Sequence, residues 1–182
     1  MTVAALLRSV VAALDAAGVP FMLTGSLAAA YHGAGRATMD IDVVIDPTEP
    51  QLGVLVRALE RSGLYVSGDA ADEALTHRSM FNVVDTASGW KADLIIRKLR
   101  PFSEMELRRR QPAAYEGCAL WVASAEDVIV AKLEWARQGG GADQQLNDVR
   151  GIIGTQANRL DRAYIERWVD DLGVRDLWAS VQ

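Results

Sequence analysis

The sequence carries Leu23-Thr24-Gly25-Ser26 and, after thirteen further residues, Asp40-Ile41-Asp42 at the head of an apolar run. In a β-strand, residues two positions apart point to the same face, so Asp40 and Asp42 project together while Ile41 points into a core. Two neighbouring carboxylates repel each other, and a divalent cation between them relieves that repulsion. The stretch therefore predicts a strand with a paired-carboxylate site, close in sequence to a small-residue turn that suits phosphate.

Length and composition set limits on the fold. The chain has 182 residues, half of them hydrophobic, which is enough for one domain with a core of its own and a modest helical extension. The only cysteine, Cys118, excludes an internal disulfide; it fits a reducing cytosol and a small buried side chain. We expect no signal peptide and no membrane partner, and hence a cytoplasmic protein. The net charge of −5 argues against a general nucleic-acid coat.

Hydrophobic periodicity, cap residues and chain breakers predict the order of elements. A first amphipathic helix ends at Gly18, and Ser26 is the expected N-cap of the next helix. Residues 68–75 are expected to form an acidic loop. Strands are predicted over 20–24, 40–46, 64–66, 80–85, 90–96 and 119–122, and helices over 27–32, 48–61, 101–110, 124–138, 143–153, 161–172 and 174–180.

Three motifs together resemble those of the DNA-polymerase-beta-like nucleotidyltransferase superfamily: Thr24-Gly25-Ser26, Arg36-Ala37-Thr38-Met39-Asp40-Ile41-Asp42 and Lys91-Ala92-Asp93-Leu94. The second motif is similar to that of small bacterial enzymes grouped with abortive-infection toxin nucleotidyltransferases and minimal antibiotic nucleotidyltransferases. The resemblance covers residues 20–96 and implies an α+β (α/β) fold, a small mixed β-sheet flanked by helices. The order of predicted elements, mixed α/β first and helical after about residue 123, predicts a catalytic core over residues 1–122 and a C-terminal helical subdomain over residues 123–182.

The resemblance also implies a role for each motif residue. Asp40, Asp42 and Asp93 would be the catalytic residues and the ligands of one or two Mg²⁺ ions, with Mn²⁺ as an alternative. Asp93 would in addition help to deprotonate the attacking hydroxyl. Gly25 has no Cβ and allows the backbone to approach a phosphate, to which the Ser26 hydroxyl would donate.

Other residues are less specific candidates for nucleotide binding. Arg36 and Thr38 precede the carboxylates; Arg36 would contact phosphate or buttress the site, the alternative being an exposed loop arginine. Lys132 lies in an apolar helical stretch and either snorkels to solvent or reaches the nucleotide phosphates. Asp148 loosely resembles an element of the toxin-like enzymes, and the alternative is an ordinary exposed helix residue.

Three further side chains are weaker candidates for the active site. Asp85 is the alternative third carboxylate, but it abuts the expected hairpin turn, and Asp residues favour turns. Asp46 precedes a proline and fits a strand-end or cap residue better. His32 could donate to a phosphate, whereas a histidine at a helix end is the commoner arrangement.

The expected reaction is transfer of a nucleoside monophosphate from an NTP such as ATP to an acceptor hydroxyl, by in-line attack and release of pyrophosphate. The acceptor could be the 3′ end of a tRNA, a protein hydroxyl or a small molecule such as an aminoglycoside. Six basic and two acidic residues between positions 97 and 110 favour RNA, whereas the acidic stretch 69–73 favours a cationic drug.

Two alternatives to a stand-alone enzyme stay open. One is a non-catalytic nucleotide- or partner-binding module of the same fold. The other is the toxin enzyme of a toxin-antitoxin pair, neutralised by an antitoxin protein. An apolar stripe on the C-terminal helices would be either a homodimer face or a face that packs on the core.

Overall fold

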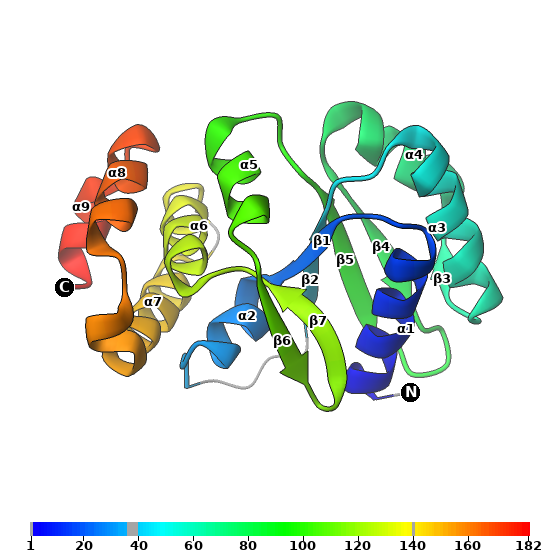
Figure 1. The fold of residues 1–182 in the computed structure, drawn as a ribbon, viewed down its shortest axis with the longest axis horizontal. Coiled ribbons are helices and arrows are strands. Elements are labelled where there is room, and N and C mark those ends of the chain that lie inside the picture. The colour runs from blue at the N-terminus through cyan, green and yellow to red at the C-terminus, as the bar shows by residue number, and fades with distance from the viewer. Residues whose placement is uncertain (1, 36–39, 140) are drawn as a thin grey trace. The chain divides into compact units, whose positions relative to one another are not determined.

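Figure 1 shows the fold in a computed structural model that describes residues 2–35, 40–139 and 141–182. Internal contacts divide the chain into two compact units. The first comprises Met1–Leu23 and Met39–Val122, and the second comprises Thr24–Thr38 and Ala123–Gln182. A short N-terminal segment therefore groups with the C-terminal helices. The expected division into a catalytic core and a helical subdomain stays a prediction.

A mixed sheet, seven-stranded over the described residues, forms the centre of the first unit in the order β3-β4-β5-β2-β1-β7-β6. Two strand pairs are parallel, β2 with β5 and β1 with β7, and the pairs β3–β4, β4–β5 and β6–β7 are antiparallel. This arrangement confirms the expected small mixed sheet. The strands are β1 (Phe21–Thr24), β2 (Ile41–Ile45), β3 (Tyr65–Val66), β4 (Met80–Val84), β5 (Lys91–Ile96), β6 (Gln111–Tyr115) and β7 (Cys118–Val122).

Helices α1 (Val3–Ala16), α3 (Glu49–Arg61) and α4 (Gly68–His77) lie together on one side of this sheet (Figure 1). The apolar stripe of α1 is buried, with Leu6, Val10 and Leu14 fully excluded from solvent. Burying a leucine or valine side chain contributes about 1.5–3 kcal/mol, so this stripe anchors α1 to the sheet. Helix α5 (Pro101–Arg108) follows β5, as expected from the sequence.

Two elements of the first unit differ from the sequence-based prediction. The expected acidic loop over residues 68–75 is helix α4, whose N-cap Ser67 accepts a hydrogen bond from the Ala70 N–H at 3.2 Å. Ala71 and Ala74 supply a narrow buried face, while the acidic residues face solvent. Strand β6 was not among the expected strands. It contains Pro112 and forms at an edge of the sheet, where proline is tolerated.

The second unit is helical over its described residues: α2 (Gly25–Tyr31), α6 (Ala125–Arg137), α7 (Ala142–Gln156), α8 (Arg162–Asp171) and α9 (Arg175–Ser180). Helix α6 packs against α7 and α8, and α8 contacts α9, as can be followed in Figure 1. Ser124 begins α6 as predicted, because its hydroxyl oxygen accepts from the Asp127 N–H at 3.2 Å. The expected helical C-terminal segment is confirmed.

Two further expectations concern the burial of Cys118 and the presence of a membrane-spanning helix. Cys118 is buried, as expected, and burial raises the pKa of its thiol. No helix within the described ranges combines the length and apolar character needed to cross a lipid bilayer.

His32 follows α2 and is a buried histidine whose protonation opposes folding. Its Nε2 lies 2.7 Å from the Ala123 carbonyl oxygen, and burial lowers the pKa of the ring. Because the unfolded chain takes up the proton first, the stabilising effect is complete above the unfolded pKa of about 6.5 and is lost as pH falls below it.

We therefore expect the free energy of unfolding to decrease by up to about 1.4 kcal/mol per pH unit from this one group between pH 6.5 and its folded pKa. Urea denaturation at pH 7.0 and 5.5 would measure the decrease in the wild type and in His32→Gln. A glutamine amide can still donate to the carbonyl but does not titrate. An identical pH dependence in both proteins would contradict the assignment to His32.

Candidate active site

The register of two neighbouring strands places acidic residues on one face of the sheet. In the parallel pair β2–β5, Asp42 lies opposite Asp93. Residues that pair across strands point to the same face, so these two carboxylates share a face, and Asp40 directly precedes β2. Asp40 is exposed, whereas Asp42 and Asp93 are half-buried. The structure thus pairs Asp93 with one member of the carboxylate pair predicted from strand periodicity.

Asp93 is contacted by two neighbours that the sequence analysis did not assign to the site. The Lys91 ammonium lies 3.1 Å from Oδ1 and 3.0 Å from Oδ2 of Asp93, so it spans the whole carboxylate. Asn82 lies opposite Asp93 in the antiparallel pair β4–β5 and donates from Nδ2 to Oδ1 at 2.5 Å. The Lys91 contact could have been predicted from the sequence, because residues two positions apart in a strand point to the same face. The Asn82 contact depends on the hairpin register.

The electrostatics of Lys91 extend this cluster to the other carboxylates. Its pKa is raised, chiefly by the hydrogen bond to Asp93 and further by the negative charges of Asp93, Asp40 and Asp42. The ammonium therefore lies in the field of all three acidic side chains that the sequence analysis singled out. Lys91, Asp40, Asp42 and Asp93 form one charged cluster, which we call the carboxylate cluster.

The donor chemistry of the carboxylate cluster suits a divalent metal. Mg²⁺ and Mn²⁺ prefer oxygen ligands, and carboxylates supply the negative charge that balances the ion. Over residues 2–35, 40–139 and 141–182, no three acidic, histidine or cysteine side chains converge closely enough to hold a metal. At Asp93 a cation is nevertheless in contact with both carboxylate oxygens, namely the Lys91 ammonium. The oxygen donors are therefore of the type that a divalent metal takes, but they do not form a three-ligand group within the described residues.

Gly25 and Ser26 belong to the second unit, at the start of α2. Thr24, not Ser26, occupies the N-cap position, so Ser26 lies in the first turn and the predicted cap was wrong. Gly25 has a φ of +62°, which glycine adopts without the steric cost that a Cβ would bring. The predicted phosphate contacts of Gly25 and Ser26 stay predictions, and Arg36 and Thr38 lie outside the described residues.

Lys132 and Asp148 form a buried ion pair between α6 and α7. The Lys132 ammonium lies 2.8 Å from Asp148 Oδ2 and donates to Gln145 Oε1 at 2.8 Å. The two charged side chains are only 5% and 4% exposed. Snorkelling of Lys132 to solvent and an exposed Asp148 were therefore wrong readings, because each charge is held in the interior by the other. Nucleotide binding by Lys132 stays a prediction.

The two rival acidic residues have structural partners. Asp46, at the end of β2, accepts from Arg97 Nε at 2.8 Å and lies 3.7 Å from an Arg78 nitrogen. Asp85 accepts from the Ala87 N–H at 3.2 Å and from the Ser88 hydroxyl in the hairpin turn. The strand-end reading of Asp46 and the turn reading of Asp85 are confirmed.

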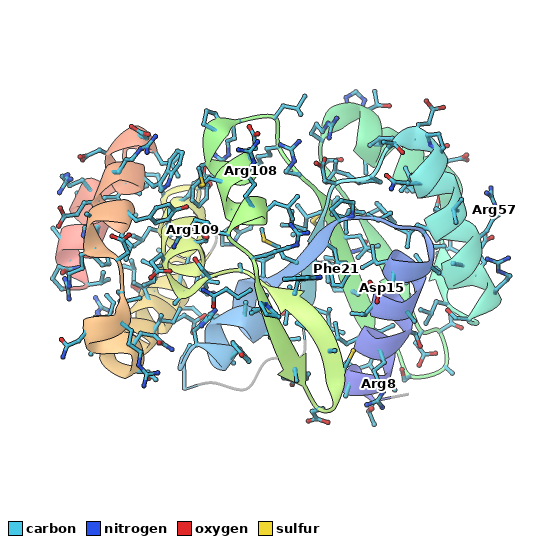
Figure 2. The ribbon with its side chains drawn as sticks, viewed as in Figure 1. Arg8, Asp15, Phe21, Arg57, Arg108 and Arg109 are labelled. Atoms are coloured by element: carbon cyan, nitrogen blue, oxygen red, sulfur yellow. The ribbon has the colours of Figure 1, made fainter. Side chains whose placement is uncertain are left out.

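The basic segment between residues 97 and 110 has many internal partners. Arg97 pairs with the aspartate at the end of β2, and Arg108 pairs with Glu104 at 2.5 Å. Arg110 donates to a backbone carbonyl at 2.7 Å, and its guanidinium lies over the Trp121 ring at 5.1 Å. Figure 2 labels Arg108 on α5 and Arg109 just after that helix. The ion pairs of Arg97 and Arg108 reduce the positive charge available to an RNA backbone.

A small pocket of about 260 Å³ lies in the first unit, lined in part by Asp15, Phe21 and Trp121. Asp15 on α1 and Phe21 on β1 are labelled in Figure 2. The Asp46 N–H donates to the Pro20 carbonyl at 2.9 Å, which places the start of β1 beside the C-terminal end of β2. The pocket therefore lies at the end of β2 opposite the carboxylate cluster and is not part of it.

Comparisons with known proteins identify the fold. No protein-family model matches the sequence, and no curated protein matches it. The solution structure of the antibiotic-resistance factor ANT(2'')-Ia matches with a TM-score of 0.62 and 15% identity, covering 97% of this chain and 93% of that chain. A crystal structure of ANT(2'')-Ia in complex with adenylyl-2''-tobramycin matches with the same score and identity, covering 94% and 97%.

A third solved structure is similar over nearly the whole chain. An antigenic nucleotidyltransferase-like protein from Paracoccidioides brasiliensis matches with a TM-score of 0.57 and 14% identity, covering 98% of this chain and 91% of that one. At such identities the comparison shows the fold alone. The chain has a nucleotidyltransferase-like fold, as the sequence motifs led us to expect.

Proposed function

We propose that this protein is a Mg²⁺-dependent nucleotidyltransferase that moves a nucleoside monophosphate from an NTP to an acceptor hydroxyl. The observation that carries the proposal is the pairing of Asp42 with Asp93 on one face of a nucleotidyltransferase-like sheet, beside Asp40. On that face the Lys91 ammonium contacts the Asp93 carboxylate and lies in the electrostatic field of Asp40 and Asp42.

In this proposal Asp40, Asp42 and Asp93 hold one or two Mg²⁺ ions, which Mn²⁺ could replace. When bound, the metal would neutralise the charge that develops on the phosphates. The acceptor oxygen forms a bond to the α-phosphorus while the bond to pyrophosphate breaks, and the Asp93 carboxylate takes the hydroxyl proton. Gly25, Ser26, Arg36, Thr38 and Lys132 are proposed to contact the nucleotide.

We infer further that the acceptor is a small cationic molecule with hydroxyl groups and that ATP is the donor. One matching structure is a complex of ANT(2'')-Ia with adenylyl-2''-tobramycin, which supports both the cationic acceptor and the ATP donor. The two chains cover each other almost completely. The net charge of −5 also favours a cationic acceptor. The internal pairing of Arg97 and Arg108 weakens the case for RNA.

The first test is calorimetric titration with ATP, CTP, GTP and UTP, each with Mg²⁺ and with EDTA. We expect metal-dependent binding of ATP, weakened at least about 100-fold in the double variant Asp40→Ala/Asp42→Ala, since uncompensated phosphate charge opposes binding. The matched control is Asp69→Ala/Asp72→Ala, which removes two exposed acidic side chains from α4 and should bind as the wild type does. Failure of the wild type to bind any triphosphate would contradict the proposal.

The alternatives give different results in simple assays. A non-catalytic module would bind a triphosphate without releasing pyrophosphate in the presence of tobramycin, a tRNA or a protein acceptor. A toxin would arrest growth on expression, and Asp40→Ala would abolish the arrest. The antitoxin partner, the homodimer and the cytoplasmic location remain predictions from the sequence.

A further inference from the structure

We propose that Lys91 is an internal cation that occupies the metal-binding oxygens of Asp93 until a divalent ion displaces it. This inference rests on the proposed function and adds a control step to the same site. After displacement, the ammonium would bind a phosphate group of the incoming triphosphate. Lys91 is then a nucleotide-binding residue that couples metal binding to nucleotide binding.

The contact between Lys91 and Asp93 is the first reason. The ammonium lies 3.0 Å and 3.1 Å from the two carboxylate oxygens, and both residues come from β5 at a spacing of two. A divalent ion at Asp93 needs at least one of those oxygens, and two cations cannot share them at hydrogen-bond distance without strong repulsion. Metal binding therefore displaces the Lys91 ammonium from the oxygen that the ion takes.

The environment of the pair makes this exchange feasible. The Lys91 side chain is 49% exposed, whereas that of Asp93 is only 13% exposed, so the lysine can swing away while the aspartate stays. Asn82 Nδ2 donates to Asp93 Oδ1 at 2.5 Å, a contact that does not involve Lys91 and that orients the carboxylate. Oδ2, which accepts from the Lys91 ammonium at 3.0 Å, then becomes available to a metal.

The neighbouring carboxylate Asp42 determines where the displaced Lys91 ammonium can bind next. Asp42 pairs in register with Asp93, so a metal held between them would repel the ammonium from this face. Lysine has a flexible four-carbon stem and three donors, and a triphosphate bound to the same metal is the nearest new anion. Lys91 would thus favour the metal–nucleotide complex over the metal alone.

Mn²⁺ binding to the nucleotide-free protein, measured by electron paramagnetic resonance, tests the first half. We expect Lys91→Met to bind Mn²⁺ about 3- to 10-fold more tightly than the wild type, because a competing charge has been removed. Lys91→Arg keeps a cation and should remain close to the wild type. The matched control is Lys98→Met, which removes an exposed lysine beyond the opposite end of β5 and should leave Mn²⁺ affinity unchanged.

The second half is tested with a non-hydrolysable triphosphate analogue in the presence of Mn²⁺. Here Lys91→Met should bind the analogue about 3- to 10-fold more weakly than the wild type does. The same substitution is thus expected to strengthen Mn²⁺ binding and to weaken analogue binding. Equal or weaker Mn²⁺ binding by Lys91→Met, at an unchanged midpoint of thermal unfolding, would overturn the inference.

The same measurements separate this inference from the proposed function. If wild-type Mn²⁺ binding requires Asp40 and Asp42 but is indifferent to Lys91→Met, only the inference about Lys91 fails. If the wild type binds no Mn²⁺ with or without the analogue, the proposed function fails and the inference fails with it.

Discussion

Replacement of Asp93 by asparagine is expected to reduce pyrophosphate release by about 100- to 10,000-fold without unfolding the protein. An amide cannot take a proton from the acceptor hydroxyl, and it is a much weaker ligand for Mg²⁺ than a carboxylate. The substitution keeps the size of the side chain and an oxygen that can accept from Asn82 and Lys91, the two neighbours that contact Asp93. The loss should therefore appear as a lower rate at an unchanged thermal midpoint.

Asp85→Asn is the matched control for this experiment. Asp85 lies in the same β-hairpin, but its carboxylate accepts hydrogen bonds from the turn. We expect this variant to retain the wild-type rate of pyrophosphate release, measured with Mg²⁺, the NTP identified by calorimetry and tobramycin as the first acceptor. Retention of activity by Asp93→Asn together with a loss in Asp85→Asn would exchange the roles assigned to the two residues.

The second large effect concerns stability. Lys132→Met is expected to lower the free energy of unfolding by about 3–5 kcal/mol, because it removes the ammonium that pairs with the buried Asp148 carboxylate. Both side chains are at most 5% exposed, and their contact joins α6 to α7. Methionine matches the length of the lysine stem, so lost packing contributes little. Urea denaturation followed by circular dichroism would measure the change.

The double variant Lys132→Met/Asp148→Leu distinguishes charge burial from packing. Removing both charges should restore most of the lost stability, since replacing a buried ion pair by apolar side chains is often neutral. If the double variant is as unstable as Lys132→Met, or if the single change costs less than about 1 kcal/mol, the ion pair does not have the energetic role assigned to it.

Most of the observed helices and strands could be predicted from local sequence patterns. The period of two around Asp40 and Asp42 indicated a strand, and the turn after Asp85 indicated a hairpin; both are observed. The acidic stretch 68–75 was misread because its helical signal consists of a cap and two alanines rather than a wide apolar stripe. Charge alone does not distinguish an exposed helix face from a loop.

The burial of charged residues was beyond the reach of the same patterns. Lys132 and Asp148 are separated along the chain and belong to different helices, so neither helix shows that its charge has a buried partner. The contact of Asn82 with Asp93 is equally hidden, because it depends on the register of β4 against β5.

By itself, the sequence determined the strand that carries Asp42 directly after Asp40, the position of Asp93 on a second strand and the helical character of the C-terminal segment. Each follows from interactions among residues close in the chain, which leave a period of two or 3.6 in the sequence. Tertiary structure alone decided that Asp42 faces Asp93, that Lys91 and Asn82 hold Asp93, and that Lys132 is neutralised by Asp148. Strand register and helix packing are set by the joint burial of many side chains, so no single segment records them.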